Sequence, residues 1–273
     1  MCKNLKHLSN IFFLLIFVFL IKNANSADVN ITADTNSQQT LQASSTLTIK
    51  SGFALRNVAV DRIVKGYNPE IDNATVVVEE NATIEGKANT IFVRETSGFT
   101  LNNSGSVIGN GSKAINLRDT QSPTITNNKG ATISGTFNVI VQQSTATEDA
   151  TGLTITNHGT IKAVGSTSER AIYIYQSSGE LAEDATITNS NTGNIYNTQD
   201  APTIAIDTSS TLTNSGTIEN RHSPSSKSIY VVGNNNTVTL KDGGKVIGLI
   251  DSDGTGNKLN IQHGAGQSYY YET

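Results

Sequence analysis

The chain contains almost no cysteine, no tryptophan and few charged residues. Its 273 residues include one Cys and no Trp, and charged side chains make up 15% of them. Cys2 lies at the N-terminus, so the rest of the chain has no thiol for a disulfide, a metal site or a nucleophile. The formal net charge of −4 at pH 7 favours neither nucleic acid nor an anionic membrane as a partner.

Small polar residues are abundant instead. Thr, Asn and Ser together account for about a third of the chain, and 23 glycines add to them. This composition is poor in the residues that favour helices. The apolar residues are mostly Ile, Val and Leu in short alternating runs, which is typical of strands rather than of disorder. We therefore expect an all-β, extended and secreted protein.

The N-terminal segment has the three parts of a secretory signal peptide. Lys3 and Lys6 precede an apolar run at residues 11–21, and small residues follow up to Ala27. The run is shorter than the about 20 residues that a membrane-spanning helix needs. The sequence therefore predicts a signal peptide at 1–26, cleavage before Ala27 and a mature chain without a transmembrane segment.

A repeated unit runs through most of the chain. It consists of a short strand, an Asn, a Gly and a further apolar pair, and its Asn positions are 24, 30, 32 and 25 residues apart. The aligned asparagines are Asn103, Asn127, Asn157, Asn189 and Asn214. A weaker copy at 237–248 has Asp242 where the other copies have Asn.

A second family of strands keeps step with the first. Its aligned apolar residues recur every 24 to 33 residues and are Ile91, Ile115, Val139, Ile172, Ile204 and Ile229. Units of this length, with short strands and no amphipathic helix, predict a right-handed parallel β-helix with one coil per unit. We expect an N-terminal cap and irregular first coils at 27–74, followed by β-helix repeats at 75–273.

The repeats also predict how the coils stack. Adjacent coils are about 4.8 Å apart, so the core is expected to contain a column formed by Ile125, Ile155, Ile187 and Leu212. The aligned asparagines are expected at corners, where Asn and Gly tolerate positive φ, with their amides bonded in a ladder along the stack. The same role is predicted for Gly105, Gly130, Gly159, Gly193 and Gly216. Ser and Thr are expected to cover the outer face.

Two acidic pairs are the candidates for catalysis. Glu148–Asp149 and Glu183–Asp184 stand in similar contexts before the Asn strand, and neighbouring coils allow Asp149 and Asp184 to approach each other. Glycoside hydrolysis uses two carboxylates about 5–10 Å apart. However, the sequence places no Lys or Arg cluster beside them to stabilise a developing anion, so a polar corner on a solvated face is favoured. We therefore assign no catalytic residue.

The remaining polar motifs are weaker. The four histidines are far apart and lack metal-ligand spacing: His7, His158, His222 and His263. The segment Asp251–Asn257 has the Asp and Gly positions of a calcium loop, but Gln262 replaces the bidentate Glu, which favours a turn. The run Tyr269–Tyr271 is either an adhesive aromatic patch or, preferably, one strand with alternating faces. No metal or cofactor is assigned.

The repeats resemble a known family. The units TITNHGTI and TLTNSGTIEN and the segment 248–273 resemble the passenger domain of a bacterial autotransporter, over roughly residues 75–273. The resemblance implies export to the periplasm, passage through an outer-membrane β-barrel translocator, and location at the cell surface or outside the cell. It also implies an adhesin-like, non-catalytic role, with glycans or a host or neighbouring cell surface as partners.

One feature departs from that family. Autotransporters carry a β-barrel after the passenger, whereas this sequence reaches Thr273 without one. We therefore expect either a passenger that is truncated at its C-terminus or a different route out of the cell.

Two further functions are kept as alternatives. A secreted lyase or hydrolase acting on polysaccharide can use the same fold, and carboxylates that converge in a groove would favour it. A barrel-less structural surface fibre is the other alternative, and self-association through an exposed apolar coil face would favour it.

Overall fold

A computed structural model describes residues 28–57, 62–67, 71–145, 148–165, 169–176 and 182–262. Within these ranges the regular elements are all β-strands, and the strands pair in parallel. In the same ranges there is no helix long and apolar enough to cross a membrane. Several predictions lie outside the described residues: the signal peptide with Cys2 and His7, and the C-terminal His263 and Tyr269–Tyr271.

Three long sheets contain almost all of the strands. The first sheet has ten strands: β1 (Val29–Ile31), β3 (Thr46–Ile49), β6 (Thr75–Val78), β9 (Thr100–Asn103), β12 (Thr124–Asn127), β16 (Thr154–Asn157), β20 (Thr186–Asn189), β23 (Thr211–Asn214), β26 (Thr237–Lys241) and β29 (Lys258–Gln262). The second sheet has eight: β4 (Ala54–Asn57), β7 (Thr83–Gly86), β10 (Ser106–Gly109), β13 (Thr132–Gly135), β17 (Thr160–Ala163), β21 (Asn194–Asn197), β24 (Thr217–Asn220) and β27 (Lys245–Ile247). The third sheet has nine: β2 (Gln39–Thr40), β5 (Arg62–Tyr67), β8 (Asn89–Arg94), β11 (Ile115–Arg118), β14 (Ile140–Ser144), β18 (Ile172–Gln176), β22 (Ile204–Ile206), β25 (Lys227–Val231) and β28 (Leu249–Ser252). A separate small sheet pairs β15 (Ala150–Thr151) with β19 (Ala182–Glu183).

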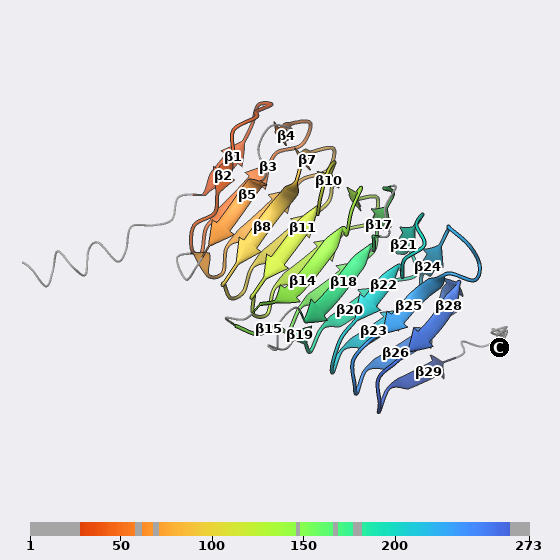
Figure 1. The fold of residues 1–273 in the computed structure, drawn as a ribbon. Helices are drawn as coiled ribbons and strands as arrows, with labels where there is room; N and C mark the ends of the chain where they lie inside the picture. Colours follow the sequence, from red (N-terminus) through yellow and green to blue (C-terminus); the bar gives the residue numbers. More distant parts are fainter. Residues whose placement is uncertain are drawn as a thin grey trace, which may run out of the picture.

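Each coil contributes one strand to each long sheet in turn. The chain runs through β12, β13 and β14 and then returns to the first sheet as β16, which pairs with β12. The strands of successive coils therefore stack side by side, and the third sheet faces the reader in Figure 1. This arrangement is a parallel β-solenoid, so the fold predicted from the repeat length is confirmed.

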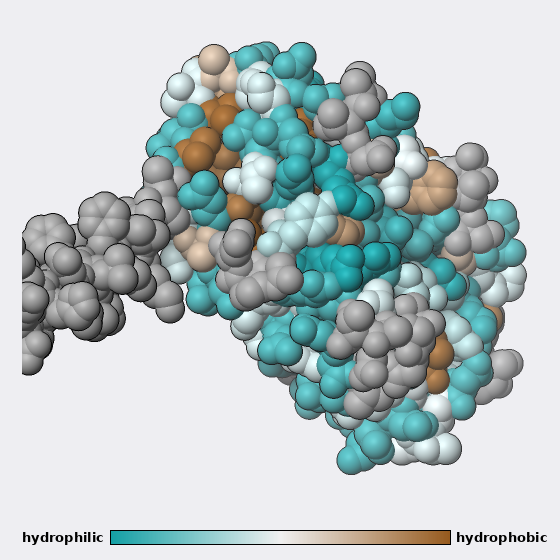
Figure 2. Space-filling view, turned by 60° about the vertical axis from the view of Figure 1, so that its left-hand side comes forward, coloured by the Kyte–Doolittle hydropathy of each residue, from teal (hydrophilic) through white to brown (hydrophobic). Residues whose placement is uncertain are grey.

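The solenoid core is built from alternate residues of every strand. Ile125, Ile155, Ile187 and Leu212 pair in register and are fully buried, as predicted. On each strand, the threonine before and after the core residue is partly or fully exposed, because neighbouring side chains on a strand point to opposite faces. The surface in Figure 2 is accordingly mostly hydrophilic, with apolar side chains in small separate patches.

The second strand family occupies the third sheet, with one shift from the predicted register. Ile115 pairs with Ile140, and Ile140 pairs with Ile172. The sequence alignment that placed Val139 in this row is therefore wrong by one residue. Val139 and Ile140 are adjacent and both fully buried, so the hydrophobic pattern alone did not distinguish them.

The predicted asparagine ladder is present and lies inside the solenoid. The five side chains are fully buried and bond through their amides, each Nδ2 donating to the next Oδ1 at 2.8 Å: Asn103, Asn127, Asn157, Asn189 and Asn214. The Nδ2 groups also donate to backbone carbonyls, as from Asn157 to Gly159 at 3.1 Å. A buried amide needs such partners, since an unpaired polar group in the core costs free energy.

The predicted reason for these asparagines was incorrect. None of the five has a positive φ, since each is the last, inward-pointing residue of its strand. Among the glycines that follow, Gly130 does have φ +84°. Gly216 instead allows two backbones to approach, because a Cβ there would lie 2.2 Å from the Ser190 carbonyl oxygen. The turn therefore requires glycine for close packing at some coils and for a left-handed conformation at another.

The ladder is closed at both ends by apolar side chains. Val78 precedes Asn103 in the row, and Leu240 follows Asn214. Placing Asp242 at this position was therefore incorrect, because the weaker copy has its inward residue two positions earlier. Asp242 instead has φ +52° in the turn that follows β26.

Candidate functional site

The outer face of the third sheet carries the largest side chains of the solenoid surface. Alternation along each strand points one residue in two outward, and parallel pairing places these residues in rows across the coils. We use the name Tyr–Arg row for one such line, which takes one residue from each of five successive strands: Tyr67, Arg94, Arg118, Gln143 and Tyr175. The strands that carry it, β5 to β18, lie next to one another in Figure 1.

A neighbouring outward row is covered rather than exposed. Phe92, Asn116 and Val141 point to the same face, yet they are 3%, 4% and 0% exposed. Arg62 lies over the Phe92 ring with its guanidinium carbon 4.2 Å from the centroid, and the Tyr67 ring is 5.4 Å from that of Phe92. Long side chains thus form a second layer on this sheet.

Three side chains form a stack around β18. The Tyr173 and Tyr175 rings are 4.2 Å apart with an interplanar angle of 14°. Arg170 places its guanidinium carbon 4.2 Å from the centroid of Tyr173. A guanidinium next to an aromatic face is attracted by the ring quadrupole and keeps its N–H groups available at the edge. The stack therefore orients both a cation and a tyrosine hydroxyl.

Gln143 links this stack to the preceding coil. Its side-chain oxygen accepts from Arg118 Nε at 3.1 Å and Nη2 at 3.2 Å, and its nitrogen donates to the Tyr175 hydroxyl at 2.8 Å. The opposite orientation would point the amide nitrogen at the donors of the guanidinium, so we adopt this one. The Gln143 amide therefore holds Arg118 through its oxygen and Tyr175 through its nitrogen.

Lys113, Arg118 and Arg170 form what we call the basic cluster. None of them makes an ion pair with another of the described residues. Burial lowers the pKa of Lys113, and Arg118 lowers it further, whereas Glu169 opposes the shift. Burial, with a contribution from Tyr173, raises the pKa of Tyr175 against the effect of Arg118. All three side chains are half-buried, so the cluster is a cationic site that is partly shielded from water.

The C-terminal part of the same sheet carries the opposite charge. Lys227 Nζ lies 2.6 Å from Asp251 Oδ2 and 4.1 Å from the centroid of Tyr230. The Tyr230 hydroxyl donates to Asp253, whose carboxylate raises the pKa of the phenol. Here the cation has a partner, in contrast to the basic cluster.

The acidic pairs from the sequence are only partly brought together. Thr151 of β15 pairs with Glu183 of β19. Burial is the largest cause that raises the pKa of Glu183, followed by the charges of Asp184 and Asp149. Glu148 is exposed and makes an isolated bridge with Thr145. Three carboxylates therefore influence one another electrostatically at this corner.

The segment Asp251–Asn257 uses its polar side chains for contacts with the preceding coil. Asp251 and Asp253 bond Lys227 and Tyr230, as described above, and Asn257 Nδ2 donates to the Gly233 carbonyl at 3.0 Å. Across the described part of the chain, no group of three or more His, Asp or Glu is arranged to hold a metal ion. His158 and His222 belong to different coils.

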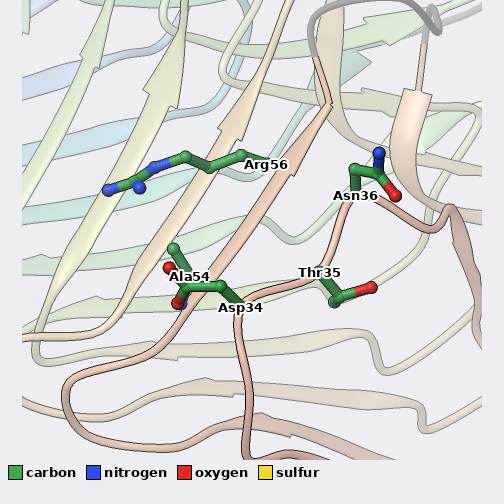
Figure 3. A pocket seen from close by; sticks show the side chains of 5 residues that line it. All are labelled: Asp34, Thr35, Asn36, Ala54 and Arg56. Carbon is green, nitrogen blue, oxygen red and sulfur yellow. The ribbon is translucent and has the colours of Figure 1, made fainter.

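A hollow of about 440 Å³ lies near the N-terminal end and is shown in Figure 3. Asp34 accepts a hydrogen bond from the Ala54 N–H at 2.9 Å, and Arg56 Nε lies 3.1 Å from Glu85 Oε2. The Arg56 guanidinium and the Asn36 amide point in opposite directions. The polar groups of this hollow are therefore used within the fold and do not converge on a ligand position.

Comparison with protein families, curated proteins and solved structures finds no match to this chain. The case for a site therefore rests on the arrangement of side chains in this structure.

The sequence did not reveal the Tyr–Arg row, although a signal was present. Counting three residues on from the aligned Ile91, Ile115 and Ile172 reaches Arg94, Arg118 and Tyr175. The same count from Val139 reaches Gln142, which points inward. The row contains Gln143 instead, because Ile140 is the residue that pairs with Ile115 and Ile172. One register error was enough to interrupt the row.

Proposed function

We propose that this protein is an exported β-solenoid of the autotransporter-passenger type, which acts by adhesive binding rather than by catalysis. The observation that carries the proposal is the Tyr–Arg row on the outer face of the third sheet. Its tyrosine, arginine and amide groups are the side chains that stack on sugar rings and hydrogen-bond to hydroxyl and anionic groups. This surface is a more specific candidate for glycan binding than the small Thr, Ser and Asn side chains on the rest of the outer surface.

The geometry suits an extended partner. The row crosses five coils at a strand spacing of about 4.8 Å, so it spans about 20 Å along the solenoid. A ligand that lies across the strands meets a tyrosine or an arginine at four of these coils, while the buried Gln143 holds its neighbours in place. Weak contacts of this kind add up when a single chain connects them.

Export is supported by the sequence of residues 1–26 and by the absence of cysteine from position 3 onwards. We expect the full chain, expressed in a Gram-negative host with a C-terminal epitope tag, to lose its first 26 residues. N-terminal sequencing of the tagged protein tests this. Recovery of the tagged protein with an uncleaved N-terminus from the cytoplasm would contradict export.

Binding is tested with a glycan array that contains neutral and acidic oligosaccharides. We expect the mature chain to bind a subset of them, and Tyr175→Ala to lose most of that binding. Tyr196→Ala is the matched control, because Tyr196 also carries an arginine on its ring (Arg221, 3.6 Å) but belongs to the second sheet. Equal loss with both variants, or no glycan bound at all, would contradict the proposal.

A polysaccharide-active enzyme is a second candidate because of Glu183. A carboxyl whose pKa is raised by burial and by neighbouring carboxylates has the character of a general acid. If this candidate holds, the chain releases reducing ends from a polysaccharide, and Glu183→Gln abolishes the release. Activity that Glu183→Gln leaves unchanged would exclude Glu183 from this role.

A further inference from the structure

We propose that the third sheet binds an acidic polysaccharide, one bearing carboxylate or sulfate groups, which lies along the solenoid with its anions on Lys113, Arg118 and Arg170. The inference rests on the proposed binding function and specifies the class of ligand. The sugar backbone is placed against Tyr175, a half-buried member of the aromatic stack.

The first argument is position. Lys113 precedes β11, Arg118 ends it, and Arg170 precedes β18, so the three cations come from coils that are two strand spacings apart. This separation is about 10 Å along the solenoid axis. The Tyr–Arg row continues through the same coils, with Gln143 between Arg118 and Tyr175. In this register Lys113 and Arg170 lie before the start of their strands, whereas Arg118, Gln143 and Tyr175 lie near the end, so the cations flank the outer face of these coils on both sides.

The second argument is that these cations make no ion pair with a described carboxylate, whereas comparable cations of the solenoid do. Arg221 and Lys227 also lie over tyrosine rings, and each makes an ion pair, at 2.7 Å with Glu219 and 2.6 Å with Asp251 respectively. The basic cluster makes no such ion pair among the described residues, and the charge of Glu169, which favours protonated Lys113, does not cancel the effect of burial on the pKa of that lysine. A desolvated cation without an anion is unfavourable. An anionic ligand would remove this cost.

The third argument comes from buried polar atoms without partners beside the cluster. Arg170 Nε and Asn116 Oδ1 are both buried and make no hydrogen bond with the described residues. Asn116 is 4% exposed and lies in the row next to Arg118, with its Nδ2 donating to Asn89 at 3.0 Å. A bound polysaccharide, with its own hydroxyl and anionic groups, would give these two atoms hydrogen-bond partners.

Charge also limits where the polyanion lies. Beyond β18 the outer face carries Asp207, Asp251 and Asp253, so a polyanion is repelled there. On β8, Arg94 is already paired with Glu95, so the favoured segment is β11 to β18. Aromatic stacking distinguishes a sugar chain from a polyanion that has only charge to offer.

The test uses the mature full chain and three probes: heparin, polygalacturonate and neutral dextran. We expect both acidic polymers to bind in a titration at low salt, with affinity that falls as salt is added, and dextran to bind much more weakly. Arg118→Gln with Arg170→Gln should weaken binding by about tenfold or more. Arg118→Lys should retain most of the affinity, which separates loss of charge from loss of fold. Arg221→Gln, on the second sheet, should change little.

Four results would overturn the inference. The first is equal loss of affinity for the double variant and Arg221→Gln. The second is polyglutamate binding as tightly as heparin while Tyr175→Ala leaves both unchanged, since the ligand would then be any polyanion. In the third, only neutral glycans bind and Tyr175→Ala abolishes their binding; the proposed function then stands while the acidic ligand fails. If no glycan of either kind binds, both proposals fail.

Discussion

At the scale of single residues, the most informative side chains are the buried asparagines. Val78 and Leu240 show that the same position in the stack accepts an apolar side chain. The asparagines are therefore retained through their mutual hydrogen bonds and not because only Asn fits. In this ladder the Asn189 Oδ1 accepts from Asn157 Nδ2, and no other donor among the described residues bonds it.

We expect Asn157→Leu to lower the free energy of unfolding by about 1–3 kcal/mol, because it leaves Asn189 Oδ1 buried without a donor. The double variant Asn157→Leu/Asn189→Leu should cost less than the sum of the two single variants, since the orphaned oxygen is removed as well. Urea denaturation measures all three. Thr156→Ala, on the same strand but facing outward, is the control and should change stability by less than about 0.5 kcal/mol. Strict additivity would contradict the explanation.

Lys113 provides a second prediction at this scale. Its folded-state pKa is lowered, mainly by burial, so its charge destabilises the fold at neutral pH. We expect Lys113→Met to be more stable than the native chain at pH 7. The free energy of unfolding of the native chain should increase relative to that of the variant as the pH rises from the lowered pKa of the folded state. The increase ends near the ordinary lysine value of about 10.5, where the unfolded chain also loses the proton. Thermal unfolding at a series of pH values tests this, and a pH-independent difference would contradict it.

At the scale of elements, each strand separates a core row from a surface row. On β16 the sequence TITN points Ile155 and Asn157 inward and leaves Thr154 and Thr156 partly exposed. The third sheet follows the same alternation, but in the Tyr–Arg row its outward residues are arginine, tyrosine and glutamine instead of threonine. The difference between a structural face and a candidate binding face therefore lies in the outward residues alone.

The inward row supplies the next prediction. Ile155 is fully buried between Ile125 and Ile187, so Ile155→Ala leaves a cavity that the neighbouring coils cannot fill. We expect a loss of about 2–5 kcal/mol in the free energy of unfolding. Denaturation in urea gives the value, with Thr154→Ala on the same strand as the outward control. A loss similar to that of the control would mean that the coil collapses around the cavity.

At the scale of the whole molecule, the solenoid is a one-dimensional stack in which each coil contacts mainly its neighbours. Central coils are covered on both sides. At the C-terminal end, by contrast, four large apolar side chains are exposed, namely Ile247, Leu249, Leu259 and Ile261. Stability is therefore expected to vary along the axis.

Amide hydrogen exchange checks this variation. We expect the slowest exchange in β12, β16 and β20, which pair on both edges, and faster exchange in β1 and β29, which are the end strands of the first sheet. Fraying from the ends explains the difference. Uniform protection along the first sheet would instead indicate that the solenoid opens as a single unit.

The features that could be predicted from the sequence are those that repeat at a regular spacing along the chain. Repeat length and period-two alternation placed the coils, the core column and the asparagine ladder, because each depends on spacing along the chain. The position of Ile140 rather than Val139, and of Leu240 rather than Asp242, depended on backbone pairing between coils. Two adjacent apolar residues give the same pattern, and only the pairing decides which one faces the core.

The candidate site illustrates the same division. The sequence by itself determined that this chain is an all-β solenoid with a threonine-rich surface and a ladder of buried amides. Only the tertiary structure brought Lys113, Arg118 and Arg170 to one face and showed that they make no ion pair among the described residues. These residues are up to 57 positions apart in the chain. Their placement on one face arises from the stacking of coils, which no pattern along the chain reveals.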